Sequence, residues 1–251
     1  SLLDARHIHG GGHKVVEDIA RNPASLDRIV MGSFILGRRM AEMTPGQSNV
    51  AVLLPNSIGC LLTFFGLHAF GRVPAMLNFS TGAVNMAAAC QAAQATTIVT
   101  SKRFIEAGGM EADLKLLSEG RKVIFLEELR EGLVLKDKLY GLFARFFSKT
   151  ALRLGGASSD PNAPAIILFT SGSEGLPKGV VLSHRNLQAN RYQVAARIAF
   201  TASDVVFNAL PMFHAFGLTG GALLNAGSWA AMMCIFGGAY GLAWFVRRQW
   251  L

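Results

Sequence analysis

The residues best suited to do chemistry stand together at positions 170–179, as Thr-Ser-Gly-Ser-Glu-Gly-Leu-Pro-Lys-Gly. This segment holds three hydroxyl side chains, three glycines and one lysine. Glycines let backbone N–H groups approach phosphate oxygens closely, hydroxyls add hydrogen-bond donors, and lysine supplies a mobile positive charge. The segment therefore predicts a loop that cradles the phosphates of a nucleotide.

Two alternatives compete with this interpretation. The Walker A loop, GxxxxGK[ST], also follows a strand and carries a lysine. Here Pro177 occupies the position of its second glycine, and Gly179 stands where a Ser or Thr should bind Mg²⁺. Pro177 also lacks a backbone N–H donor, which disfavours a Walker loop. The other alternative is a solvent loop of ordinary turn residues.

The loop must be positioned by the elements on either side of it. The apolar run 165–169 predicts a buried strand directly before the loop, and apolar residues return at 180–184. A helix is expected over 186–198 and a further strand over 205–210, where Pro211 ends it. The loop is thus short and fixed at both ends, which favours a built site over a solvent loop.

Upstream, short apolar runs alternate with longer helical patterns, which is typical of an α/β fold with a parallel sheet covered by helices on both faces. We expect an amphipathic helix over 127–149 and a flexible linker near 155–163, rich in Gly and Ser. The predicted strands cover 50–54, 73–77, 96–100 and 123–126, and the predicted helices cover 58–70 and 84–95.

Composition limits the class of protein. The chain has 251 residues, of which 51% are hydrophobic, so it can bury a sizeable core. Its net charge of +8 is spread along the chain, which suits an anionic ligand or a membrane surface better than nucleic-acid recognition. The three cysteines are far apart and predict neither a disulfide framework nor a zinc site, so we expect a cytoplasmic protein.

Two segments together resemble a known family. The run from Phe169 to His184 is similar to the signature loop of the acyl- and aminoacyl-adenylate-forming superfamily, and Leu210–Leu218 resembles the next core motif of that superfamily. The resemblance extends upstream through 50–56 and 70–78. Glu174, where most relatives have Thr, is similar to one subgroup, the bifunctional 2-acylglycerophosphoethanolamine acyltransferase/acyl-[acyl-carrier-protein] synthetases.

The resemblance implies a reaction and a set of site residues. A fatty acid carboxylate would attack the α-phosphate of ATP, giving acyl-AMP and pyrophosphate, and a thiol of acyl carrier protein or CoA would then take the acyl group. Lys178 and His214 are the expected catalytic residues, with His214 beside the carboxylate or the adenylate. Without the resemblance, a single His after a Phe is as often a core residue with its hydrogen bonds satisfied as a functional one. The expected nucleotide-binding residues are Thr170, Ser171, Gly172, Ser173, Glu174, Gly175, Lys178 and Gly179.

The resemblance also implies a metal cofactor and later catalytic residues, and this sequence lacks some of those residues. Relatives use ATP with Mg²⁺, held by a later acidic residue, and a lysine on a C-terminal domain. In this chain Lys178 is the last lysine, Glu174 the last glutamate and Asp204 the last aspartate. We therefore expect residues 1–224 to be a partial N-terminal domain that lacks the C-terminal domain, binds ATP weakly and forms little or no acyl-adenylate alone.

The tail leaves two interpretations open. Residues 205–246 contain no charged side chain, and the nearly continuous apolar run before Arg247 is long enough to span a bilayer. Residues 225–251 are thus expected to be either a remnant of the core or a membrane segment. The alternative to an enzyme is a membrane-associated remnant or binding module with a vestigial loop, at the cytoplasmic face of the inner membrane.

Two smaller features have plain explanations. The histidines at 7, 9 and 13 have no Cys or carboxylate partner nearby, so we expect a flexible terminal loop and no metal site. The Leu and Phe stripe at 133–147 is interspersed with Lys and Arg and predicts a core-facing helix, with a membrane-surface helix as the alternative.

Overall fold

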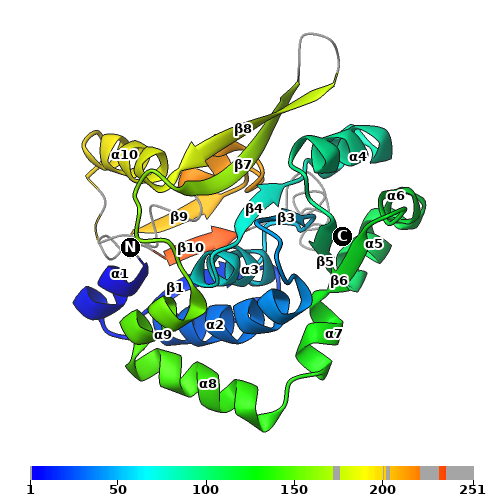
Figure 1. Cartoon of the computed structure of the whole chain (residues 1–251). Helices are drawn as coiled ribbons and strands as arrows, with labels where there is room; N and C mark the ends of the chain where they lie inside the picture. Colours follow the sequence, from blue (N-terminus) through cyan, green and yellow to red (C-terminus); the bar gives the residue numbers. More distant parts are fainter. Residues whose placement is uncertain (1, 172–175, 200, 202–203, 221–231, 236–251) are drawn as a thin grey trace, which may run out of the picture.

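The structure is a computed structural model that describes residues 2–171, 176–199, 201, 204–220 and 232–235. Its larger sheet has six strands in the order β6-β5-β3-β4-β7-β8 (Figure 1). All neighbouring strands of this sheet run parallel except β7 and β8, which pair antiparallel as a hairpin. The strands are β3 (Asn49–Val52), β4 (Val73–Met76), β5 (Thr97–Thr100), β6 (Lys122–Phe125), β7 (Pro164–Ser171) and β8 (Pro177–Ser183).

A second sheet has four strands in the order β2-β1-β10-β9. Strands β1, β10 and β9 are parallel, and the short β2 pairs antiparallel with β1. This sheet joins segments from both ends of the described chain, because β10 lies between β1 and β9. The bounds are β1 (Lys14–Asp18), β2 (Ala24–Ser25), β9 (Val205–Asn208) and β10 (Met232–Ile235).

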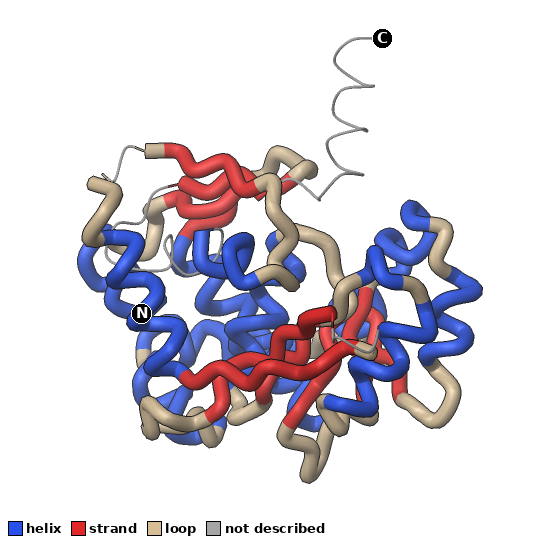
Figure 2. The backbone as a smooth tube through the Cα atoms, turned by 90° about the horizontal axis from the view of Figure 1, so that it is seen from above, coloured by secondary structure: helices blue, strands red, loops and turns tan. Residues whose placement is uncertain are grey.

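Helices cover both faces of the larger sheet, as the view from above shows (Figure 2). One face of this sheet packs on α3 (Ile58–Ala69), and α3 packs in turn on α2 (Leu26–Met43). The other face is covered by α4 (Ala83–Ala92), α5 (Lys102–Gly108) and α6 (Glu111–Leu117). The remaining helices are α1 (Leu2–His9), the 3₁₀ turn η1 (Phe79–Thr81), α7 (Leu126–Glu131), α8 (Leu135–Phe146), α9 (Ser148–Gly155), α10 (His184–Ala195) and α11 (Ala215–Leu218).

The alternation of side chains along β3 explains the two cores. Val50, Val52 and Leu54 point toward α3 and join the core between the sheets, whereas Ala51 and Leu53 point toward α4 and join the outer core. Side chains of a strand alternate between faces, and a strand buried on both faces therefore reads as a continuous apolar run. The predicted α/β fold, a mostly parallel sheet covered by helices, is confirmed.

Two glycines allow α2 and α3 to pack closely. Gly37 of α2 and Gly66 of α3 face each other, and a Cβ added to Gly37 would lie 2.8 Å from the Cα of Gly66. Real Cβ atoms do not approach backbone atoms that closely, so neither position accepts a larger residue without moving the helices. This contact fixes α3, which in turn supports β3 and the residues that follow it.

Some local expectations are wrong. The segment expected as one helix over 127–149 is instead three helices, α7, α8 and the start of α9, because Gly132 ends α7 and Phe147 separates α8 from α9. His7 and His9 lie in α1 and not in a flexible loop.

No helix within the described ranges is long and apolar enough to cross a membrane. Of the tail 225–251, the structure describes only β10, and the rest lies outside the described residues.

Candidate functional site

The predicted phosphate loop forms the tip of the β7–β8 hairpin. Thr170 pairs with Lys178 and Ser171 with Pro177 across the hairpin. Both ends of the predicted loop are therefore strand residues, and the connection between the strands is shorter than 170–179. Four of the predicted nucleotide-binding residues lie outside the described residues: Gly172, Ser173, Glu174 and Gly175. The backbone of Ser171 belongs to β7.

The register of the hairpin decides which way Thr170 and Lys178 face. Ile166 and Leu168 of β7 pack into the core between the two sheets, and Thr170 continues this alternate series. Directly opposed residues of an antiparallel pair share a face, so Lys178 lies on the same side as Thr170. Both side chains are exposed. The hairpin thus presents a hydroxyl and an ammonium group toward one side of the sheet.

Gly179 has a packing reason for being glycine. It pairs with Phe169, and an added Cβ would lie 3.3 Å from Cγ2 of Ile167 and 3.5 Å from the ring of Phe169. These contacts lie on the opposite side of the hairpin from Thr170 and Lys178. Gly179 therefore supports the hairpin, in addition to the nucleotide-binding role expected from sequence.

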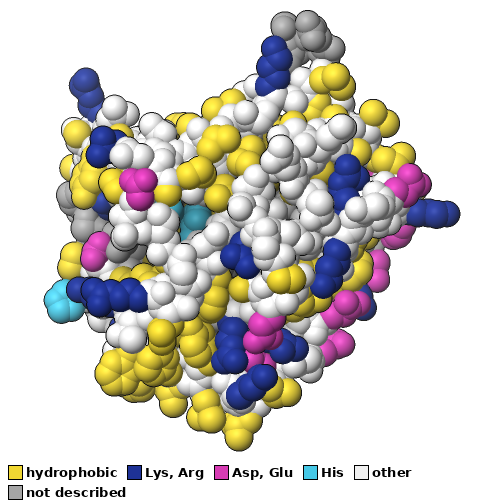
Figure 3. All heavy atoms as spheres, viewed as in Figure 1, with side chains coloured by type: hydrophobic (Ala, Val, Ile, Leu, Met, Phe, Trp, Pro, Cys, Tyr) yellow, Lys and Arg dark blue, Asp and Glu magenta, His cyan; other side chains and the backbone are white. Residues whose placement is uncertain are grey.

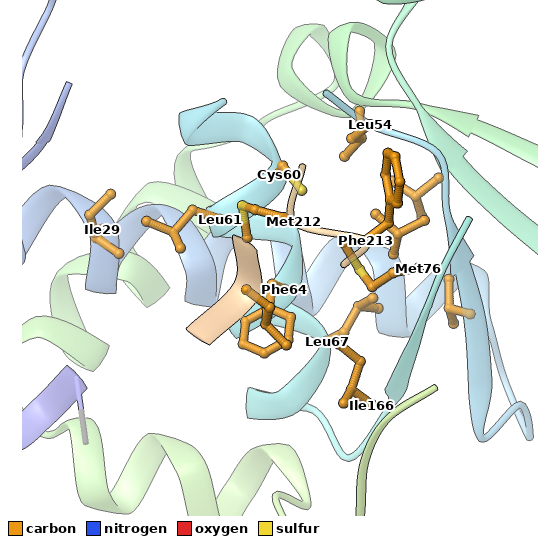
Figure 4. Packing of buried hydrophobic residues seen from close by; sticks show 14 of the residues in the cluster. Ile29, Leu54, Cys60, Leu61, Phe64, Leu67, Met76, Ile166, Met212 and Phe213 are labelled. Atoms are coloured by element: carbon orange, nitrogen blue, oxygen red, sulfur yellow. The ribbon is translucent and has the colours of Figure 1, made fainter. Parts of the chain in front are cut away.

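The second motif, Leu210–Leu218, joins the same core between the sheets. Met212 and Phe213 are buried there and lie close to Leu54, Phe64 and Met76 (Figure 4). The Phe213 ring meets the Phe79 ring edge-on, with centroids 4.9 Å apart. Because β7 and this motif both contribute to one core, the structure brings them to the same side of the larger sheet.

His214 stands at the position before α11, next to the buried Phe213. The centroids of the two rings are 4.6 Å apart, and the His214 side chain is exposed. Its backbone is extended, with φ −95° and ψ 142°, and its N–H donates to the Pro211 carbonyl over 3.0 Å. The alternative of a buried core histidine is therefore wrong, and the ring is free to meet a ligand from solvent.

Asn56 positions this motif, although sequence reasoning assigned it no such role. Its side-chain amide donates to the Leu210 carbonyl over 2.7 Å, and its side-chain oxygen accepts from the Met212 N–H over 2.8 Å. Asn56 is buried, with 4% of its surface exposed, and follows β3 through Pro55. Two bonds from one side chain thus tie the end of β3 to the segment before His214. The Pro-Asn pair after an apolar run was the only signal in the sequence.

A second clamp closes the motif from its other end. The side-chain amide of Asn208 donates to the Gly217 carbonyl over 3.1 Å, inside the core. An added Cβ on Gly217 would lie 2.7 Å from the Leu210 carbonyl oxygen, so this position requires glycine. The chain therefore folds back on itself between Asn208 and Gly217 and holds His214 at the bend.

The described residues do not provide a protein site for the Mg²⁺ that the resemblance implies. Within the parts of the chain that the structure describes, no group of three His, Cys, Asp or Glu side chains is placed to hold a metal ion. A cavity beside α10 is lined by residues of α1, α2, α3, α9 and α10, and by none of the described residues of the hairpin tip or the 210–218 motif.

Sequence comparisons relate this chain to known enzymes. A family model described as "AMP-binding enzyme" matches residues 38–237. 4-Coumarate–CoA ligase 4 of Arabidopsis thaliana is 27% identical over 80% of this chain and 36% of its own length. A medium-chain fatty-acid–CoA ligase of Escherichia coli is 47% identical over 23% of this chain and 10% of its own length. The chain spans about a third of the length of the first of these relatives.

Solved structures share the fold. ATP-bound MatB from Rhodopseudomonas palustris matches 94% of this chain and 44% of its own, with a TM-score of 0.73 and 20% identity. O-Succinylbenzoate coenzyme A synthetase (MenE) from Bacillus subtilis, in complex with AMP, matches 98% of this chain and 58% of its own, with a TM-score of 0.75 and 15% identity. The two sheets and their helices are therefore an arrangement found in the nucleotide-bound structures of both proteins.

Proposed function

This chain belongs to the AMP-binding enzyme family, and on that premise we propose that it is part of an enzyme that activates a fatty acid with ATP. A carboxylate oxygen of the acid attacks the α-phosphorus, the bond to the bridging oxygen of pyrophosphate breaks, and acyl-AMP forms. A thiol of acyl carrier protein or CoA then attacks the acyl carbon and releases AMP. The chain contributes the hairpin and the 210–218 motif to this site.

One observation supports the proposal most strongly: Thr170 and Lys178 of the hairpin face the side of the larger sheet on which the 210–218 motif packs. Thr170 and Lys178 offer a hydroxyl and a positive charge where the departing pyrophosphate gathers negative charge. His214 stands exposed beside the buried Phe213, where it can orient the acid carboxylate. In this division of roles, Lys178 holds the β- and γ-phosphates and His214 aligns the nucleophile.

The fatty acid and the thiol acceptor are finer parts of the proposal. A fatty acid is favoured by the similarity to a medium-chain fatty-acid–CoA ligase, although that similarity covers only 57 residues. Acyl carrier protein is favoured by Glu174, which resembles the bifunctional acyltransferase/acyl-carrier-protein synthetases. CoA remains the competing acceptor, because the curated relatives are named as CoA ligases.

The test is acid-dependent exchange of pyrophosphate into ATP by the protein that contains this chain. We expect exchange with fatty acids, and we expect Lys178→Ala to reduce it by about tenfold or more, since charge-assisted hydrogen bonds to phosphate are lost. Lys115→Ala, on exposed α6, is the matched control. Labelled acyl-AMP offered to holo acyl carrier protein or to CoA then identifies the acceptor. The proposal is contradicted if no acid increases the rate of exchange, or if the Lys178→Ala protein exchanges at the parent rate.

A second candidate role is attachment to a membrane surface, and the outer face of α8 and α9 favours it. Leu135, Leu139, Leu142 and Phe146 recur at helical spacing along α8, and each exposes between 42% and 71% of its surface. The opposite face of α8 packs on α2 through Gly141 and Ala144. Figure 3 shows hydrophobic side chains gathered at this lower end of the molecule. The core-facing helix expected from sequence therefore has an apolar outer face as well.

The charges around this face favour lipid over a second copy of the chain. Lys136, Lys138, Lys149 and Arg153 are exposed beside the apolar stripe, while Asp137, the sole acidic residue between 132 and 156, is buried. Amphipathic helices with such basic flanks lie in the interface of anionic membranes, where each basic residue contributes about 1 kcal/mol. Two copies meeting through this face would instead oppose like charges.

The vesicle test separates these outcomes. We expect the protein to sediment with phosphatidylcholine vesicles that contain phosphatidylglycerol and less with pure phosphatidylcholine. A Leu139→Gln/Phe146→Gln double variant should lose this binding, and Val84→Gln/Leu116→Gln, on exposed positions of α4 and α6, should keep it. Equal binding by both double variants, or a dimer that only the first disrupts, refutes the membrane role.

A further inference from the structure

A cavity beside α10 lies apart from the candidate site and has the features of a ligand pocket of its own. Its volume is about 320 Å³, and it lies between α10 on one side and α1, α2, α3 and the segment from α9 on the others. Figure 3 shows a hollow below α10 with a histidine side chain at its floor. Pockets that bind small ligands have volumes of about 300 Å³ or more.

Four residues of α10 form one wall of the cavity. His184, Leu187, Gln188 and Arg191 line it, and their spacing of three and four residues places them on one face of the helix. The opposing walls are mostly apolar. They are contributed by Val30, Phe34, Phe64, Phe65, Ala69 and Leu152. A ligand body that fills this space would therefore be apolar.

Arg191 is a buried cation that lacks an acidic partner in the described structure. Only 5% of the residue is exposed, and no Asp or Glu of the described chain forms an ion pair with it. Its Nε donates to the Gln188 side chain over 3.0 Å, and its guanidinium carbon lies 4.4 Å from the Tyr192 ring centroid. No described group accepts a hydrogen bond from its two terminal nitrogens. A buried charge without a partner is costly, so its retention points to an anionic ligand.

A second polar group in the lining also lacks a partner. The hydroxyl oxygen of Ser33 on α2 is buried and forms no hydrogen bond among the described residues. Burial lowers the pKa of His68 to about 4 and also lowers the pKa of His184, so both rings are neutral near pH 7. None of the described residues that line the cavity is acidic, and Arg191 is therefore the single charged side chain among them near neutral pH.

We propose that this cavity binds a compact apolar molecule with one terminal carboxylate, whose head group pairs with Arg191 and whose body packs against the aromatic walls. Guanidinium groups bind carboxylates through two parallel hydrogen bonds, which makes the pairing selective for an acid over an alcohol. The Ser33 hydroxyl offers one further hydrogen bond. The site is separate from the proposed ATP site, since none of the described residues of the hairpin tip or of the 210–218 motif lines it.

Calorimetric titration with octanoate tests the proposal, with 1-octanol and acetate as probes that lack the charge or the apolar body. We expect octanoate to bind about tenfold more tightly than either probe. Arg191→Met should abolish that preference for the acid, and Arg191→Lys should keep part of it. Because the substituted charge has no acidic partner, Arg191→Met should not lower the melting temperature of the free protein.

Two further variants keep the outcome interpretable. Ser33→Leu places an apolar side chain in the cavity and should block octanoate even if Arg191→Met fails to fold. His214→Ala should leave octanoate binding unchanged, because His214 does not line this cavity. That result separates this cavity from an acyl site beside the 210–218 motif and from any failure of the proposed activity. The inference is overturned if octanoate and octanol bind equally, if Ser33→Leu binds octanoate like the parent, or if His214→Ala alone abolishes binding.

Discussion

Asn56→Ala should uncouple the segment before His214 from the end of β3. In the native fold one buried side chain satisfies both the Leu210 carbonyl and the Met212 N–H, over 2.7 and 2.8 Å. Alanine removes both partners and leaves two backbone groups in a site from which water is largely excluded. An unsatisfied buried polar group costs about 1–3 kcal/mol, so the expected loss of stability is about 2–6 kcal/mol.

The assay is thermal and urea unfolding of the parent and the variant, followed by circular dichroism. The matched control is Asn85→Ala, because Asn85 donates one exposed hydrogen bond to the Thr81 carbonyl over 2.9 Å. Exposed positions of this kind usually change stability by no more than about 0.5 kcal/mol. Asn56→Ala should therefore lower the melting point by several degrees more than the control.

The functional consequence follows from the same two bonds. If Asn56 holds the bend that carries His214, its loss should reduce acid-dependent pyrophosphate exchange more than it reduces ATP binding by the hairpin. A variant that unfolds no more easily than Asn85→Ala, with unchanged exchange, would refute the role given to Asn56. Asn56→Asp keeps one acceptor for the Met212 N–H, and we expect an intermediate loss.

Three further perturbations test the fold around the site. Gly217→Ala should destabilise by about 1–3 kcal/mol, because its Cβ would meet the Leu210 carbonyl oxygen, while Gly220→Ala has open space and should be near neutral in melting experiments. Gly37→Ala should cost a similar amount by separating α2 from α3, visible as a lower urea midpoint. His68 has a pKa lowered to about 4 by burial, against about 6.5 unfolded, so the unfolded state binds the proton first as pH falls. Stability should therefore be complete above pH 6.5 and fall by up to about 3 kcal/mol toward pH 4, and His68→Asn should flatten that slope.

The sequence was sufficient for the elements with strong periodic patterns. The strand expected at 50–54 corresponds to β3, whose apolar run is buried on both faces of the sheet. The helix expected at 58–70 corresponds to α3, whose apolar run lies between the two sheets. Family membership was predictable for a related reason: the 169–184 and 210–218 segments are short, ordered and rich in residues with special backbone or donor roles.

Long-range contacts were beyond sequence reasoning. Asn56 reads as a turn residue after Pro55, and nothing local indicates that it bonds Leu210 and Met212, more than 150 residues away. The cavity beside α10 could not be predicted either, since Ser33 and Arg191 line one cavity only because of tertiary packing. The segment 127–149 predicts a single helix because its continuous amphipathic pattern does not show the breaks at Gly132 and Phe147.

Equilibrium binding of ATP to this chain tests most directly whether the β7–β8 hairpin is a phosphate cradle. Titration calorimetry should detect ATP binding that Lys178→Ala weakens by about tenfold or more, while Lys115→Ala leaves it unchanged. AMP lacks the β- and γ-phosphates, so Lys178→Ala should change the affinity for AMP far less. Equal affinities for ATP in the parent and Lys178→Ala proteins would contradict the account.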